Sequence, residues 1–126
     1  AEGTDVTIIA CGHLVWKAIE AGEILAQQGI SAEIINIHTI KPLDAKAVIA
    51  SAKKTKCVVT AEEHQMNGGL GDSIAQLLAT QLPTPMEFVA VNDKFGESGT
   101  EEQLMTKYGI NTANIVEAVQ KVIKRK

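Results

Sequence analysis

The fold is decided by residues 56–81, which read KCVVTAEEHQMNGGLGDSIAQLLATQ. The apolar, β-branched run from Lys56 to Ala61 predicts a strand that is buried on both faces. A Gly-rich, acidic loop from Glu62 to Gly71 follows, and apolar residues at helical spacing then predict a helix from about Leu70 to Gln81. The residues of this helix that are expected to face the core are Leu70, Ile74, Leu77 and Leu78.

The same order of strand and helix extends toward both ends of the chain. Because parallel strands need helical crossovers, this alternation predicts an α/β fold, a three-layer α/β/α sandwich around a mainly parallel sheet. The other predicted strands are Val6 to Cys11, Ala32 to Ile37 and Met86 to Val91. The other predicted helices are Leu14 to Gln28, Ala45 to about Lys54, a short one after Thr100, and a last one capped by Asn111 or Thr112.

The first predicted helix has a clear apolar face and a clear end. Its core-facing residues are expected to be Leu14, Ala18, Ala21 and Leu25, with Ile24 nearby. Gly29 is expected to end the helix, because glycine readily adopts the left-handed conformation of the C′ position.

Length and composition fit one globular domain that covers residues 1–126, with 45% hydrophobic and 21% charged residues. The net charge of −3 argues against nucleic acid and anionic membranes as partners, because such binding depends on Lys and Arg. Cys11 and Cys57 both lie in apolar runs, as reduced core thiols do in a cytoplasmic protein. The chain begins at Ala1 without a Met, which suggests processing or excision from a longer protein.

Function is expected at the carboxyl ends of the parallel strands, where helix N-termini also point. All three histidines, His13, His38 and His64, follow predicted strands and therefore share this edge. Three histidines could hold zinc, but none has the spacing of a known motif, and loop histidines are common. The metal site remains the less favoured interpretation.

The adjacent carboxylates of Glu62 and Glu63 suggest general acid/base chemistry, although neighbours on an extended segment usually point in opposite directions. One of them is therefore expected to dock against the N-terminus of the following helix while the other meets solvent or a partner. The glycines of Asn67 to Gly71 could hold a phosphate, but the segment lacks a P-loop pattern, and a sharp structural turn explains them better.

Several segments together resemble the C-terminal domain of transketolases, most closely the C-terminal section of split bacterial enzymes. They are Thr39 to Asp44, Thr60 to His64, Gly68 to Gly71, Asp93 to Gly99 and Lys107 to Gly109. The resemblance covers the chain from Asp5 to its end. It implies an enzyme that transfers a two-carbon ketol unit between sugar phosphates in the pentose phosphate pathway, with thiamine diphosphate and a divalent metal (Mg) as cofactors.

The resemblance also implies that the catalytic thiamine-diphosphate-binding domains are absent from this chain. The isolated domain is then inactive and contains no catalytic, cofactor-binding or metal-binding residue. Its expected partners are the N-terminal and pyrimidine-binding domains of transketolase, in a homodimer of the full enzyme. The candidate domain-interface residues are Glu62, Glu63, His64, Gly68, Gly69, Asp93, Phe95 and Glu97.

Three alternatives remain open. The chain could be the C-terminal domain of a 2-oxoacid dehydrogenase beta subunit, or that of a deoxyxylulose-phosphate synthase. It could also be a stand-alone effector-binding domain whose site is the three-histidine edge. His13 and His38 lie outside the most specific motifs and receive no family role.

Overall fold

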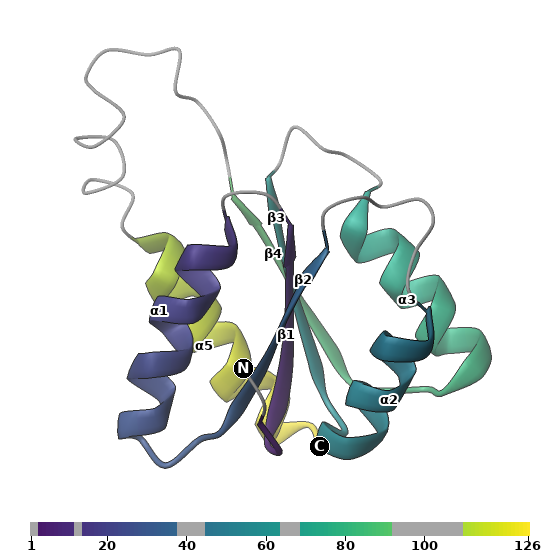
Figure 1. The fold of residues 1–126 in the computed structure, drawn as a ribbon, viewed down its shortest axis with the longest axis horizontal. Coiled ribbons are helices and arrows are strands. Elements are labelled where there is room, and N and C mark those ends of the chain that lie inside the picture. The colour runs from purple at the N-terminus through teal and green to yellow at the C-terminus, as the bar shows by residue number, and fades with distance from the viewer. Residues whose placement is uncertain (1–2, 12–13, 38–44, 64–68, 92–109) are drawn as a thin grey trace.

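In the computed structural model, four parallel strands form one sheet (Figure 1). The structure describes residues 3–11, 14–37, 45–63, 69–91 and 110–126. The strands are β1 (Val6–Cys11), β2 (Ala32–Ile37), β3 (Val58–Glu63) and β4 (Met86–Val91). Their order across the sheet is β2-β1-β3-β4, so β2 and β4 are the outer strands.

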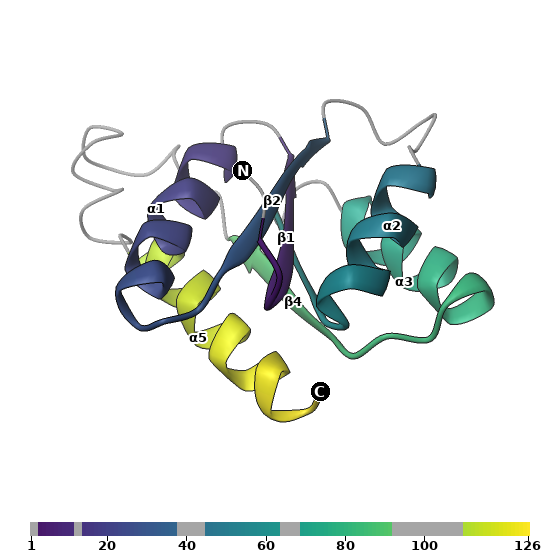
Figure 2. The same cartoon turned by 60° about the horizontal axis from the view of Figure 1, so that its bottom comes forward.

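Helices cover both faces of this sheet (Figure 1). The described helices are α1 (Leu14–Gln27), α2 (Ala45–Thr55), α3 (Leu70–Gln81) and α5 (Ile110–Lys124). Figure 2 shows α1 and α5 on one face and α2 and α3 on the other. The predicted three-layer α/β/α sandwich around a parallel sheet is confirmed.

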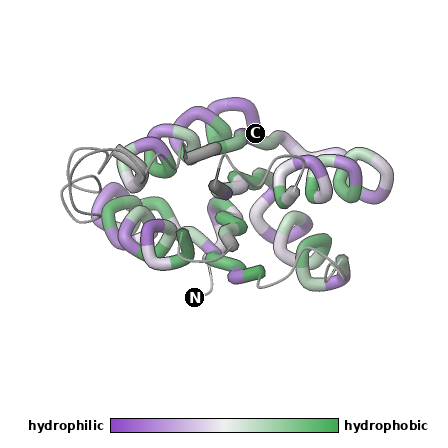
Figure 3. Tube along the Cα trace, turned by 90° about the horizontal axis from the view of Figure 1, so that it is seen from above, coloured by the Kyte–Doolittle hydropathy of each residue, from purple (hydrophilic) through white to green (hydrophobic). Residues whose placement is uncertain are grey.

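Two apolar clusters hold the layers together, one on each face of the sheet. Seen from above, the hydrophobic strands lie between the helices (Figure 3). The cluster under α1 and α5 includes Ile8, Val59 and Val119, and the cluster under α2 and α3 includes Ile9 and Ile74. Each of these side chains is fully buried. The chain therefore buries a core on both faces of its own sheet.

Helix α1 ends as predicted, at a glycine in the left-handed conformation. Gly29 has a φ of 81°. Its amide donates to the carbonyl of Ala26, and the amide of Ile30 donates to the carbonyl of Leu25. This pair of bonds is the Schellman motif, which satisfies carbonyl groups that the end of a helix would otherwise leave unpaired.

The buried face of α1 differs from the prediction at one position. Leu14, Ala18, Ala21 and Leu25 are buried as predicted, but Ile24 is 40% exposed. Lys17 is buried in its place. Its ammonium group lies 4.1 Å from the centre of the Trp16 ring and 3.6 Å from Oε1 of Glu20, so both the ring and the carboxylate compensate the charge.

The last helix begins earlier than predicted, at Ile110. Thr112 therefore lies inside α5 and is not its cap. Its hydroxyl donates instead to Oε1 of Glu20 at 3.0 Å, which joins α5 to α1. Sequence spacing could not reveal this use of the hydroxyl, because its partner lies 92 positions away.

The buried Cys57 is a free thiol, as predicted for a core cysteine. Its Sγ atom lies 3.2 Å from the carbonyl oxygen of Asp5, and burial raises the pKa of the thiol. The side chain of Cys11 lies outside the described residues. Among the helices that the structure describes, none is long and apolar enough to cross a membrane.

Candidate functional site

The candidate site lies at the carboxyl ends of the strands, where β3 leads toward α3. The prediction that Glu62 and Glu63 lie in a loop was wrong. Both residues belong to β3, where they pair with Ala90 and Val91 of β4. The strand continues through them because β4 extends equally far and supplies ladder partners, which the sequence of β3 does not reveal.

The side chain of Glu62 caps α3 from the neighbouring strand. Its Oε2 atom accepts a hydrogen bond from the amide of Leu70 at 2.7 Å, and its Oε1 atom accepts one from the amide of Gly71 at 3.2 Å. Gly69, the residue before the helix, has no side chain with which to cap these amides. The prediction that one carboxylate of the pair docks on the next helix is confirmed for Glu62.

A negative charge at this position interacts favourably with two features of the helix start. The first amides of a helix have no partner within the helix, and the helix dipole is positive at that end. A carboxylate that accepts hydrogen bonds from two backbone amides gives those amides a partner and places a negative charge at the positive end of the dipole. Such charge-assisted hydrogen bonds are also stronger than neutral ones. Glu62 therefore fixes the start of α3 relative to the end of β3.

The last glycine of the motif, Gly71, permits this close approach. A Cβ atom at Gly71 would lie 3.0 Å from Cδ1 of Phe88 and 3.1 Å from Oε1 of Glu62. Both distances are shorter than ordinary van der Waals contacts. A larger residue would push α3 away from the carboxylate that caps it, so the Gly at this position serves packing.

The capped helix start does not fit a diphosphate. An anion bound there would need the amides of Leu70 and Gly71, and both already bind the carboxylate of Glu62. A second anion beside that carboxylate would also be repelled. The described residues of this edge thus do not form a site for thiamine diphosphate, and Gly71 has the structural role that the sequence predicted.

Most of the other predicted site residues lie outside the described parts of the chain. They are His64, Gly68, Asp93, Phe95 and Glu97, together with His13, His38 and the side chain of Glu63. Of the eight candidate interface residues, the structure brings Glu62 and Gly69 together at the start of α3. Across the described ranges, no group of three or more His, Cys, Asp or Glu residues could hold a metal.

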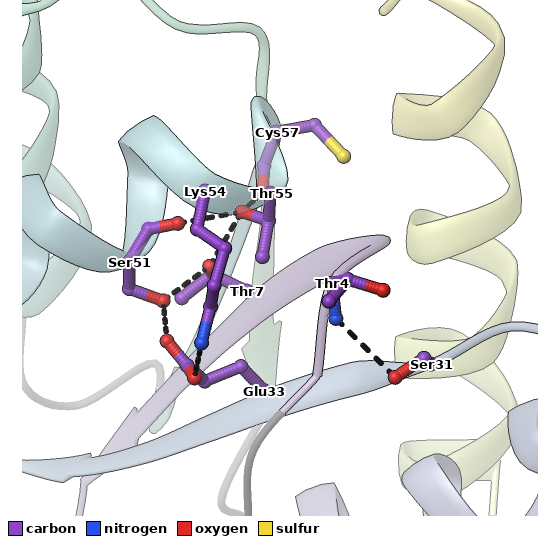
Figure 4. A network of polar contacts seen from close by, with 8 residues as sticks. All are labelled: Thr4, Thr7, Ser31, Glu33, Ser51, Lys54, Thr55 and Cys57. Carbon is purple, nitrogen blue, oxygen red and sulfur yellow. Dashed lines mark hydrogen bonds and ion pairs between the residues drawn. The ribbon is translucent and has the colours of Figure 1, made fainter.

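A polar network that was not predicted from the sequence lies at the opposite edge, where β1 and β2 begin (Figure 4). The hydroxyl of Thr7 lies 2.6 Å from those of Ser51 and Thr55, and the Ser51 hydroxyl donates to the carboxylate of Glu33. Lys54 donates to the other oxygen of that carboxylate. Ser51 and Thr55 are four residues apart on α2, a spacing that places them on one face and was the available signal.

The protons of this network lead toward the carboxylate of Glu33. The hydroxyl of Ser51 donates its single proton to Glu33, so it accepts from the hydroxyl of Thr7. The hydroxyl of Thr55 lies within hydrogen-bond distance of Thr7 and of the carbonyl oxygens of Ser51 and Cys57, and these three acceptors share its one proton. Buried hydroxyls and a charge therefore coexist between β1, β2 and α2 because each has polar partners.

The pKa of Glu33 reflects this arrangement. Burial raises it, because the side chain is only 14% exposed, but the bonds from Lys54 and Ser51, the Lys54 charge and the amide of Gly3 together lower it below its ordinary value. A carboxylate with a lowered pKa in the folded state stabilises the fold at neutral pH.

Replacing Glu33 by glutamine is expected to lower the free energy of unfolding at pH 7 by about 1–2 kcal/mol. The stabilisation by Glu33 is fully present above the pKa of the unfolded chain, about 4.3, and is lost as the pH falls through the lower pKa of the folded state. Urea unfolding of E33Q and the wild type should therefore differ at pH 7 and converge at about pH 2. E23Q removes an exposed carboxylate of α1 and serves as the control. A constant difference between E33Q and the wild type across this range would contradict the assignment.

Comparisons with known proteins identify the family. The sequence model of the family described as "Transketolase, C-terminal domain" matches residues 1–115. A Clostridium (strain MSTE9) protein, the 6-deoxy-6-sulfo-D-fructose transketolase subunit SqwH, is 48% identical over 99% of this chain and 39% of its own. A Geobacter sulfurreducens 1-deoxy-D-xylulose-5-phosphate synthase 1 is 39% identical over all of this chain and 20% of its own.

A solved structure agrees with these relatives. It is described as a split gene transketolase in an inactive beta4 tetramer, and it superposes with a TM-score of 0.85 at 45% identity, over 98% of this chain and 40% of its own. The chain thus spans about two-fifths or less of the proteins it matches. With the family's own model matching nearly its whole length, the chain belongs to the transketolase C-terminal domain family.

Proposed function

We propose that this chain is the C-terminal domain of a transketolase subunit, whose whole enzyme transfers a two-carbon ketol unit between sugar phosphates. The observation that carries the proposal is the 48% identity, over 99% of the chain, to a protein named as a transketolase subunit. Thiamine diphosphate and Mg are bound by other domains in this proposal. Residues 1–126 act as one structural domain within a cytoplasmic oligomer.

The proposed role of the carboxyl edge is contact with the pyrimidine-binding and N-terminal domains. Glu62 supports this role indirectly, because by capping α3 it holds the end of β3 and the start of the helix in a fixed relation. Two segments would then present polar groups to the partner domain. One contains Glu63, His64 and Gly68, and the other contains Asp93, Phe95 and Glu97. Homodimer formation by the full enzyme is part of the same proposal.

Calorimetric titration tests whether the cofactor belongs to other domains. The chain of 126 residues is expected to give no binding heat with thiamine diphosphate and Mg²⁺. The complete subunit, joined by its N-terminal partner, is expected to bind the cofactor and to transfer ketol units between sugar phosphates. Micromolar binding to the chain alone, or a complete enzyme without ketol transfer, would contradict the proposal.

The second candidate is the C-terminal domain of a 1-deoxy-D-xylulose-5-phosphate synthase. It is favoured by the Geobacter relative, which aligns with the whole chain at 39% identity. Formation of 1-deoxy-D-xylulose 5-phosphate by the complete enzyme, in the absence of ketol transfer, would select this candidate.

A further inference from the structure

The outer edge of β4 has backbone groups that point away from the sheet. Among the strands that the structure describes, β4 pairs with β3 alone. Val58 of β3 lies level with Met86, and the amide of Val58 donates to the carbonyl of Pro85 at 3.0 Å. Successive residues of a strand direct their backbone groups to alternate sides, so those of Met86, Phe88 and Ala90 point away from β3. Such a row of outward groups is a template on which another strand can pair.

The side chain of Arg125 binds this edge at its first residue. Arg125 follows α5, and its Nη1 atom donates to the carbonyl oxygen of Met86 at 2.7 Å. Figure 2 shows the end of α5 beside the start of β4. The same nitrogen donates to Oε2 of Glu87, and Oε1 of Glu87 lies 3.8 Å from Nζ of Lys121. The Glu87 side chain, only 19% exposed, thus anchors the guanidinium group on the edge.

The surface beside this edge favours association. Phe88 is 55% exposed, although it is aromatic and lies in the middle of β4. Natural proteins often block such an outer strand with a charged side chain. Arg125 has this effect at Met86, because it occupies an outward carbonyl and places a charge where a further strand would lie.

We propose that Arg125, anchored by Glu87, closes the outer edge of β4 against pairing with the β4 strand of a second copy of this chain. An antiparallel pair centred on the two Phe88 residues would place Met86 of each copy opposite Ala90 of the other. The Met86 carbonyl would then have to accept the amide of Ala90, but Arg125 already binds that carbonyl. Since the pair is two-fold symmetric, the guanidinium groups block it at both ends. The blocked edge is independent of the activity proposed above.

A second copy is the partner that this edge fits once Arg125 is removed. The pair would bring the exposed rings of both Phe88 residues together on one face of the sheet and bury them. On the other face, Arg125 contacts Met86 and Lys121 contacts Glu87, so α5 runs opposite to β4.

Charges on α5 are complementary in the same arrangement. Glu117 lies one turn before Lys121, farther toward the end of β4, and both side chains line an open groove between β4 and α5. Two-fold pairing would bring Lys121 of one copy toward Glu117 of the other, so opposite charges would meet at two places.

Arg125→Ala tests the proposal, with Lys126→Ala as the matched control. Both variants remove one positive charge, but Lys126 donates to the carbonyl of Asp5 and not to β4. The chain buries a core on both faces of its own sheet, so it is studied as it stands. Sedimentation velocity measures the mass of each variant over a range of protein concentrations, and NMR measures exchange of the Phe88 amide.

The mass of R125A is expected to rise toward that of two chains as the concentration increases. Exchange of the Phe88 amide in R125A should become at least about tenfold slower over the same range, because strand pairing would protect it. In the wild type and in K126A, exchange of this amide should not depend on concentration. Such dependence in the wild type would show that the edge is open and would overturn the proposal.

Charge variants in the R125A chain identify the partner and its register. R125A/E117K would set Lys against Lys, and R125A/K121E would set Glu against Glu, so each chain alone should associate at least about tenfold more weakly than R125A. An equal mixture of the two chains should recover the association, because opposite charges then meet at both places. A mixture that associates no better than its components would contradict the two-fold pairing of β4.

Two further results would overturn the proposal. A rise in the mass of R125A without protection of the Phe88 amide would assign the association to another surface. Equal protection in K126A would mean that loss of charge, and not release of the edge, drives association.

Glu87→Gln keeps the proposal testable if circular dichroism shows that R125A folds poorly. This variant leaves Arg125 in place and removes its charged anchor. Protection of the Phe88 amide in E87Q should appear at a higher protein concentration than in R125A. Exchange that is independent of concentration in a folded E87Q and in R125A would refute the closed edge.

Discussion

Ile74→Ala is expected to lower the free energy of unfolding by about 3 kcal/mol. Ile74 is fully buried on α3 and belongs to the cluster that joins α2 and α3 to the sheet, with Ile9, Val58 and Leu78. Shortening the side chain removes apolar contacts and leaves a cavity in a closely packed interior, and both effects destabilise the folded state. Urea unfolding followed by circular dichroism measures the loss.

Ile24→Ala is the matched control for this prediction. It makes the same chemical change on α1, where the isoleucine side chain is 40% exposed, and it should cost about 1 kcal/mol or less. Equal losses for the two variants would mean that α3 is not docked on the sheet through Ile74.

Removal of the Glu62 carboxylate is expected to produce the second largest effect. Glu62→Ala leaves the amides of Leu70 and Gly71 without their acceptor and should cost about 2 kcal/mol of stability. Glu62→Gln keeps one acceptor oxygen but turns an amide group toward the second N–H, so an intermediate loss is expected. The order of stability is wild type, then E62Q, then E62A.

Amide exchange at the start of α3 provides a local measurement of the same effect. Exchange of the Leu70 and Gly71 amides, followed by NMR, should be at least about tenfold faster in E62A, because a loss of 1.4 kcal/mol corresponds to a factor of ten. Glu117→Gln, which alters an exposed carboxylate on α5, should leave these amides unchanged. Unchanged exchange in E62A would show that Glu62 does not cap the helix in solution.

Capping by Glu62 also bears on how the domain would serve a larger enzyme. The carboxylate joins the last residues of a central strand to the first turn of a helix, so the two move as one unit. Loops that leave such an edge start from fixed points, which favours a defined contact with another domain. A structural role of this kind requires no cofactor in this chain.

The sequence alone determined the architecture. Short apolar runs mark the strands, and helices between them repeat apolar residues every three to four positions, so β1, β2 and β4 were predicted with their observed bounds. The Gly29 helix end was equally predictable, because it depends on local conformation. Such features are determined within a few residues, where the sequence contains all the necessary information.

The sequence predicted part of the candidate site. It indicated that one of the paired carboxylates would dock on the next helix, since side chains alternate along an extended segment. It could not show whether Glu62 or Glu63 would do so. That choice depends on the strand geometry of both residues, which is set by their pairing with β4.

Contacts between distant segments were decided only by the tertiary structure. The Thr7, Ser51 and Glu33 network joins residues that are up to 44 positions apart, and the exposure of Ile24 depends on where α1 rests on the sheet. The approach of α1 to β2 likewise depends on Gly22, where a Cβ atom would lie 3.1 Å from Cδ1 of Ile34. Periodicity shows which face of an element is apolar, but only packing shows how much of that face a neighbour covers.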